Sequence, residues 1–145
     1  MSLTQGSLSL KRFLVLGPVP DEKDLVGGLV QDRFRPFEDG LDEERMGWVD
    51  WRNPLLVPAE PDWVIQDRFA LFALRLDTRR VPNALLKAHV DMRLRRLMAE
   101  KDLVRVGREA RISVQDEVKV ELMRKVLPAL KVVEVAWYLK GGQLW

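Results

Sequence analysis

The sequence contains no cysteine and only one histidine among its 145 residues. The absence of cysteine excludes disulfide bonds, thiolate zinc sites and cysteine nucleophiles within this chain. The single histidine, His89, excludes a multi-histidine metal site in one chain. No apolar run approaches the roughly 18 residues that a membrane-spanning helix needs, and no signal-peptide pattern follows Lys11 and Arg12. We therefore expect a cytoplasmic protein with no metal, no cofactor and no membrane partner.

The chain also lacks a strong net charge, because 24 Lys and Arg nearly balance 22 Asp and Glu, which leaves +2. The charges are unevenly distributed, however. Residues 1–74 hold eight basic and 13 acidic residues, whereas residues 79–111 hold ten basic and four acidic ones. The low total thus excludes a uniformly basic protein but leaves room for a local basic surface.

Arginine dominates this basic segment, and its planar guanidinium suits bidentate contacts with phosphate. A helix pair carrying these residues would bind a nucleic-acid backbone without reading its sequence. From the pattern alone, a solvated helix face that serves solubility is an equally good interpretation. The candidate phosphate-binding residues are Arg79, Arg80, Lys87, Arg93, Arg95, Arg96, Arg105, Arg108 and Arg111.

The N-terminal third predicts a strand, a helix and an irregular loop. The apolar run 12–16 before Gly17 and Pro18 is typical of a buried strand. Acidic residues then open a helix over 21–34, in which we interpret Gly27 and Gly28 as sites of close packing.

Residues 35–63 hold four prolines, an acidic cluster over 38–44 and three tryptophans, and they show no periodicity. We expect a solvated acidic loop that is pinned by buried aromatic residues. Trp48, Trp51 and Trp63 remain open to a second interpretation, stacking on nucleic-acid bases.

The rest of the chain alternates strand and helix signals. Residues 63–77 are strand-like, with a central run that is apolar on both faces and therefore central in a sheet. Helices are expected over 82–101 and 114–127, the second capped by Ser113, and an alternating strand follows over 133–140 with Trp137 on its buried face. Gly141 and Gly142 predict a hairpin turn.

These elements predict an α+β fold with a mixed or antiparallel sheet. One N-terminal helix, a central pair of longer helices and a C-terminal β-hairpin complete it. We expect a single domain over residues 1–145, incomplete at its hairpin, with the helix–loop–helix over 82–128 as a candidate subdomain.

Parts of the sequence also fit two other functions. Asp62, Glu117 and Lys119 match the acidic-acidic-lysine set of metal-dependent nucleases, but Glu117 and Lys119 would point about 200° apart on one helix. The acidic loop 38–44 could instead be the partner surface of a protein-interaction module. His89 has no nucleophile placed beside it, and we interpret it as a helix-surface residue.

Several blocks, in this order, resemble the N-terminal half of the recombination-associated protein RdgC family. They are Met46-Gly47-Trp48-Val49, then Val81-Pro82-Asn83-Ala84-Leu85-Leu86-Lys87, then Asp116-Glu117-Val118-Lys119 with Leu122, Leu127 and Pro128, and finally the Trp137 strand with its glycine turn. The resemblance spans nearly the whole chain from about residue 11.

The resemblance implies a nucleoid-associated protein that binds duplex DNA without sequence preference and modulates recombination. It also implies ring-shaped homodimers and a link to the recombinase RecA, and binding rather than nuclease activity despite the exonuclease label of some members. The family chain is about twice as long. It has an aromatic residue just after the proline that ends the second helix, where this sequence has Leu130 and Lys131.

Overall fold

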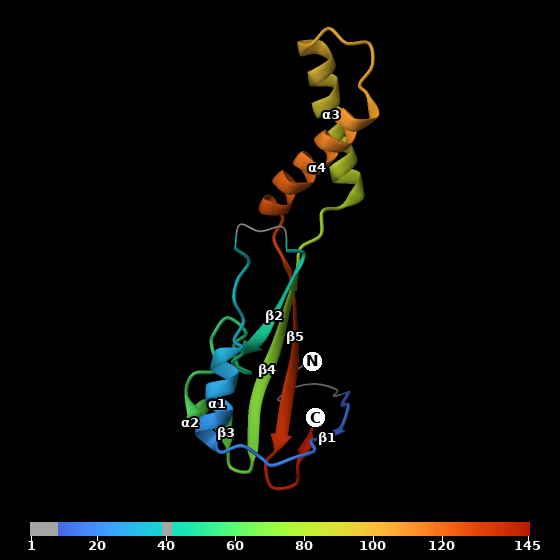
Figure 1. Cartoon of the computed structure of the whole chain (residues 1–145). Coiled ribbons are helices and arrows are strands. Elements are labelled where there is room, and N and C mark those ends of the chain that lie inside the picture. Colours follow the sequence, from blue (N-terminus) through green and yellow to red (C-terminus); the bar gives the residue numbers. More distant parts are fainter. Residues whose placement is uncertain (1–8, 39–41) are drawn as a thin grey trace. The chain divides into compact units, whose positions relative to one another are not determined.

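The computed structural model describes residues 9–38 and 42–145, and these residues form an α+β structure (Figure 1). The chain divides into two compact units. The sheet unit comprises the segments up to Pro36, Glu44–Asp77 and Leu130–Trp145, and the helix-pair unit comprises Phe37–Glu43 and Thr78–Ala129. The α+β fold class predicted from the sequence is confirmed.

The sheet has six strands. Five lie in the order β1-β6-β5-β4-β2, and β3 also pairs with β4. The strands of the path are β1 (Phe13–Leu14), β6 (Gln143–Leu144), β5 (Ala129–Tyr138), β4 (Phe69–Thr78) and β2 (Glu44–Val49). The neighbouring long strands β4 and β5 run in opposite directions (Figure 1). The predicted C-terminal hairpin is confirmed, since β5 and β6 pair antiparallel with Trp137 opposite Leu144.

The strand β4 lies between β5 and β2, as its two-sided apolar pattern predicts. Ala70 and Phe72 face a core formed with helix α1 (Glu22–Gln31) and Trp137 of β5. Ala73 belongs to a second core with Phe34 and Val49. Because successive strand residues point to opposite faces, both faces of β4 are covered. The prediction that Trp137 is a core residue is confirmed, since it is 8% exposed.

Three sequence-based expectations about strands are wrong. The predicted buried strand over 12–16 is the two-residue β1, which is exposed because it lies at the end of the sheet and pairs only with β6. The strand expected over 63–77 is divided into α2 (Pro61–Val64), β3 (Ile65–Gln66) and β4, because Asp67 turns the chain with φ 55°. The region expected to be an irregular loop contains β2.

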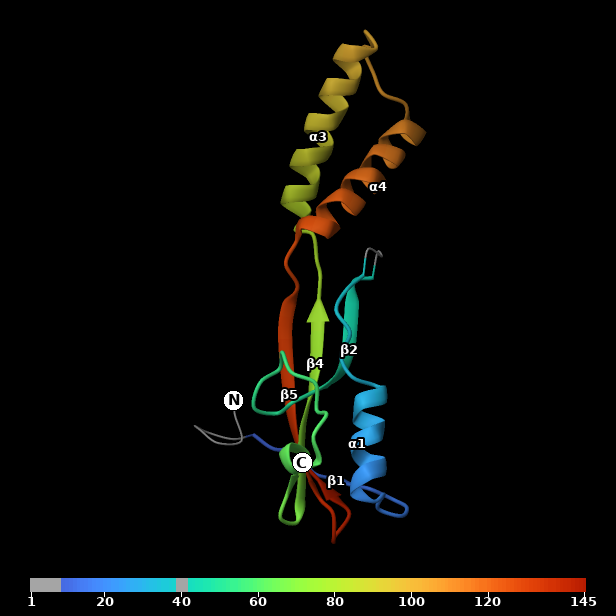
Figure 2. The same ribbon diagram turned by 90° about the vertical axis from the view of Figure 1, so that its left-hand side faces the viewer.

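The helix-pair unit contains α3 (Asn83–Glu100) and α4 (Arg108–Lys125), which lie side by side and run in opposite directions (Figure 2). Pro82, the expected first residue of this helix, is instead the N-cap of α3. The expected start of the second helix is wrong, because α4 begins six residues earlier, after the N-cap Gly107. Ser113 therefore lies inside the helix, where its hydroxyl donates to Glu117 Oε1 at 3.3 Å instead of capping.

Asp21 is the N-cap of α1, and its carboxylate accepts a hydrogen bond from Asp24 N at 2.7 Å. Val26 and Leu29 are buried on its inner stripe. Our interpretation of Gly27 and Gly28 as close-packing positions is wrong. Both residues are exposed, and a Cβ added at either would meet no atom within 4 Å.

The double substitution Gly27→Ala/Gly28→Ala is therefore expected to stabilise the protein. Alanine loses less backbone entropy than glycine when a helix forms, which is worth about 0.5–1 kcal/mol per site. Chemical denaturation followed by circular dichroism would measure the gain in the free energy of unfolding. An unchanged or lower stability would show that these positions have a packing role that the open space around them hides.

Candidate nucleic-acid interface

The two long helices hold the basic segment together through one apolar core. Val90 and Leu94 of α3 pack against Val114, Val118 and Leu122 of α4, and Val106 of the connection joins them. The apolar stripes were predicted for both helices, and they leave the remaining helix surface to charged side chains. This core therefore decides which arginines face solvent.

Eight of the nine candidate phosphate-binding residues are exposed. Lys87, Arg93, Arg95 and Arg96 lie on α3, while Arg108 and Arg111 lie in the first turns of α4 rather than in a connecting loop. Arg105 lies in the connection between the helices, and Arg80 precedes α3.

The ninth residue, Arg79, is not at the surface, and its assignment as a phosphate contact is wrong. It is 7% exposed, and its guanidinium lies over the Phe37 ring at 4.0 Å from the centroid. Its Nη2 donates to Asp42 O at 3.2 Å and its Nη1 to Met123 O at 3.5 Å. Arg79 therefore holds together segments of the helix-pair unit that are far apart in the sequence.

Arg93 and Arg96 have carboxylate partners. Arg93 Nη2 lies 3.0 Å from Glu121 Oε2, and Arg96 Nε lies 2.7 Å from Glu100 Oε1. The pKa of Glu121 is lowered below its usual value, chiefly by the hydrogen bond and charge of Lys125 and further by Arg93. Because the lowered pKa keeps Glu121 ionised at neutral pH, this carboxylate offsets the positive charge of the neighbouring Arg93.

Five of the eight exposed candidate residues form no ion pair within residues 9–38 and 42–145. We call them the unpaired cations: Lys87, Arg95, Arg105, Arg108 and Arg111. The amide groups at the N-terminus of α4, beside Arg108 and Arg111, have no side-chain cap and add partial positive charge. An anion at this end of the helix pair would thus meet Arg108, Arg111 and these amide groups, against the single carboxylate of Glu109 in the first turn.

The basic residues do not share one face of the helix pair. Lys87 and Arg111 line a groove of about 420 Å³ that contains one carboxylate, Asp91. Arg93 and Arg96 line another groove of about 280 Å³ together with Glu100 and Glu117. Lys87 and Arg96 are nine residues apart, which places them on opposite sides of α3. The more positive side is therefore the one that carries Lys87 and Arg111.

In the nuclease alternative, Glu117 and Lys119 would act at one site, but each of them has a different partner. Lys119 Nζ lies 2.9 Å from Glu43 Oε1, while Glu117 accepts a hydrogen bond from Ser113. Both lie on α4, as the sequence predicts, and Asp62 belongs to the sheet unit. In the described part of the chain no group of three or more His, Cys, Asp or Glu side chains could hold a metal ion.

The acidic segment 38–44 is exposed at Glu38, Asp42, Glu43 and Glu44, as expected for a solvated loop, although Glu44 already belongs to β2. Its residues 39–41 lie outside the described part. The pKa of Glu43 is lowered below its usual value by the hydrogen bond from Lys119 and by the charges of Lys119 and Arg80.

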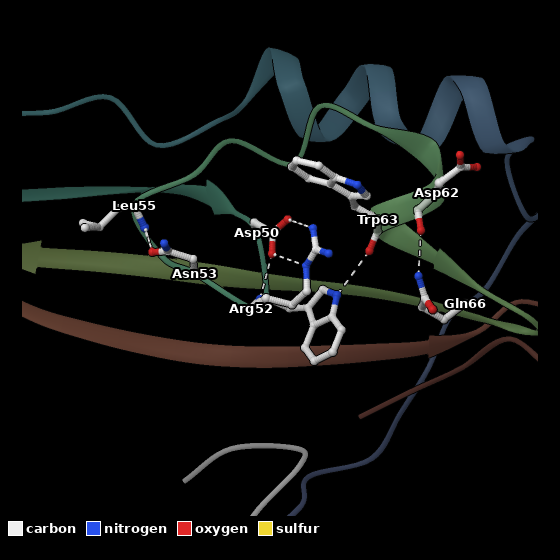
Figure 3. Close-up of polar contacts among 8 residues, drawn as sticks. Asp50, Arg52, Asn53, Leu55, Asp62, Trp63 and Gln66 are labelled. Carbon is white, nitrogen blue, oxygen red and sulfur yellow. Dashed lines mark hydrogen bonds and ion pairs between the residues drawn. The ribbon is translucent and has the colours of Figure 1, made fainter.

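Each of Trp48, Trp51 and Trp63 has a contact within the sheet unit. Trp48 meets Phe72 edge to face, with the ring centroids 5.1 Å apart. Trp51 Nε1 donates to Trp63 O at 3.2 Å, and the Arg52 guanidinium lies 4.5 Å from the centroid of the Trp63 ring (Figure 3). The contacts of Trp48 and Trp51 favour pinning of the loop, although neither ring is fully buried. Trp63 is 40% exposed, so both interpretations stay open for it.

Asp50 binds Arg52, the residue whose guanidinium lies over the Trp63 ring. Asp50 is 2% exposed and accepts hydrogen bonds from Arg52 N, Nε and Nη2 at 2.8, 3.1 and 2.9 Å (Figure 3). Burial alone would raise the pKa of Asp50, but the hydrogen bonds and charge of Arg52 lower it below its usual value. The Asp50–Arg52 pair therefore stabilises the fold fully at pH values above the ordinary pKa of a carboxyl group. This stabilisation is lost as the pH falls through the lowered pKa of Asp50.

No family model matches the sequence, and no curated protein matches it either. The described residues include no helix with the length and apolar character needed to cross a bilayer. The resemblance to the RdgC family therefore rests on the sequence blocks given above. Of these, Met46-Gly47-Trp48-Val49 lies on β2. The block over 81–87 begins just before α3, and the block that starts at Asp116 lies on α4 except for Leu127 and Pro128, which follow it.

Proposed function

We propose that this chain binds double-stranded DNA without sequence preference, as a nucleoid-associated protein that modulates recombination. The observation that carries the proposal is the set of five unpaired cations on the helix pair. Four of the five are arginines, and guanidinium groups match the oxygen spacing of phosphate. The resemblance to the RdgC family points independently to the same function.

The contacts are assigned to the DNA backbone rather than to base edges. Long, flexible cations spread over two helices and a connection suit phosphates, which carry the same charge at every base pair. Arg80, Arg93 and Arg96 are secondary contacts in this proposal, because acidic residues lie close to them. Arg79 has no part in it.

The test is a titration of a labelled duplex at several salt concentrations. Each phosphate contact releases counterions, so the logarithm of affinity is expected to fall with the logarithm of salt by about 0.9 per contact. Five contacts give a slope near −4.5 by the same relation, roughly the same for duplexes of unrelated sequence. No binding at about 0.05 M salt, where such contacts are strong, would overturn the proposal.

The proposal includes no catalytic step. Duplex DNA incubated with Mg²⁺ or Mn²⁺ under the same conditions is expected to stay intact. Metal-dependent cleavage that disappears in Glu117→Ala would instead favour the nuclease alternative. The homodimer, the RecA partner and the nucleoid localisation are parts of the proposal that rest on the family resemblance alone.

A further inference from the structure

A cavity in the sheet unit is lined by three arginines from two segments of the chain. Arg33, Arg35 and Arg45 surround a space of about 580 Å³, which we call the arginine groove. Asp32 is the one carboxylate among its lining residues. The lining thus carries three positive charges against one negative charge, in a region that the sequence marks as acidic on average.

The groove exists because the segment after α1 pairs with β2. Phe34 N donates to Trp48 O at 2.9 Å and Trp48 N donates to Asp32 O at 3.0 Å, which forms a parallel bridge between Arg33 and Trp48. In this extended segment Arg33 and Arg35 point to the same side, while Phe34 is buried between them.

Gly47 permits this close approach. A Cβ at position 47 would lie 2.4 Å from both Phe34 Cα and Phe34 N, which are backbone atoms that cannot turn aside. The glycine of the Met46-Gly47-Trp48-Val49 block therefore brings Arg33 and Arg35 up to Arg45, which lies two residues earlier on the same face of β2.

Two of the three groove arginines have no acidic partner in the described part of the chain. Neither Arg33 nor Arg35 forms an ion pair with any residue that the structure describes. Arg33 Nη1 donates to Val30 O at 3.1 Å, which fixes the side chain and leaves its other donors available. Arg45 is half-buried, so its position is also constrained.

Three guanidinium groups around one space suit an anion with several acceptor oxygens. Phosphate is the common biological group that accepts such bidentate contacts. A catalytic or metal role is not indicated, because the lining has no histidine and a single carboxylate.

We propose that the arginine groove binds phosphate groups of a nucleic-acid backbone. The inference rests on the proposed DNA-binding function and extends it, since it adds a second contact site in the sheet unit to the cations of the helix pair.

The test compares two variants of equal charge in the full chain. The groove variant is Arg33→Gln/Arg35→Gln/Arg45→Gln, and the control is Lys23→Gln/Arg68→Gln/Lys140→Gln, which removes three exposed cations elsewhere in the sheet unit. The groove variant is expected to lose about 2–3 units of salt slope, and its affinity for duplex DNA at 0.1 M salt is expected to fall by roughly 10²-fold. The control is expected to lose less than about one unit of slope.

Equal losses in both variants would overturn the inference and leave the DNA-binding function standing. If the triple variant fails to fold, as judged by circular dichroism, Arg33→Gln/Arg35→Gln is compared with Lys23→Gln/Lys140→Gln, which leaves the half-buried Arg45 in place.

A second experiment tests whether the arginine groove binds phosphate, independently of whether the protein binds DNA. Inorganic pyrophosphate is titrated into the wild-type protein, and the arginine Nε–H signals are followed by nuclear magnetic resonance. Saturable shifts of the Arg33, Arg35 and Arg45 signals, without a shift at Arg68, would support a phosphate site even if the protein failed to bind duplex DNA. The absence of such shifts in a protein that binds no DNA would overturn the inference together with the proposed function.

Discussion

Neutralising four of the unpaired cations, in the variant Lys87→Gln/Arg105→Gln/Arg108→Gln/Arg111→Gln, is expected to lower the affinity for duplex DNA by on the order of 10³-fold at 0.1 M salt. Each lost phosphate contact removes about 0.9 from the salt slope, so the slope is expected to fall by about 3–4. These side chains are exposed and unpaired, so their replacement leaves the apolar core between α3 and α4 intact.

The matched control is Arg93→Gln/Arg96→Gln/Lys119→Gln/Lys125→Gln, which removes the same charge from the same two helices. Each of these cations has a carboxylate partner within 3.0 Å. A phosphate would have to compete with that carboxylate, so the control is expected to lose about tenfold or less. Equal losses would show that the overall charge of the helix pair, rather than the unpaired cations, governs binding. Electrophoretic mobility shifts and fluorescence anisotropy at matched salt would measure the DNA affinities of the variant and of the control.

Replacing Arg75 by methionine is expected to lower the free energy of unfolding by about 3–5 kcal/mol. Arg75 donates from Nε and Nη2 to Asp77 at 2.8 and 2.6 Å, and from Nη1 to Pro54 O at 3.0 Å. Its guanidinium also lies 4.1 Å from the centroid of the Phe34 ring. The Asp77 side chain is only 3% exposed, so its charge loses its partner without gaining water.

The double variant Arg75→Met/Asp77→Leu separates an unpaired buried charge from a general loss of packing. Two apolar side chains of similar volume remove the charge together with its partner, and such replacements are often close to neutral. We expect the double variant to recover most of the stability that Arg75→Met loses, as measured by urea denaturation. A double variant that is less stable than the single one would show that the pair contributes net stability through its contacts with Pro54 and Phe34.

Local patterns in the sequence predict most of the helices and the central strand. The stripes through Val90 and Leu94 and through Val118 and Leu122 locate α3 and α4, because helical periodicity is a local property. The two-sided apolar run of β4 likewise predicts its central place. The early start of α4 at Gly107 could have been read from the same sequence, since Arg, Glu and Ala favour a helix as strongly as the residues that follow.

The strand β2 was missed because its sequence does not alternate. Met46 is exposed while Gly47 and Val49 are buried, and the glycine is explained only by the backbone of Phe34, which lies against it. The same contact creates the arginine groove. A signal was present in the alternation of Arg33 and Arg35, but nothing local joins them to Arg45.

The sequence by itself determined that the chain is an α+β protein without disulfides, with an arginine-rich pair of helices as its most basic part. Composition and periodicity carry that information, because each depends on near neighbours along the chain. The tertiary structure decided what each arginine does. Arg79 is buried by Phe37 and Met123, Arg93 is paired with Glu121 across the helix pair, and Arg33 and Arg35 meet Arg45. These outcomes depend on contacts between residues ten to more than forty positions apart, which no local pattern contains.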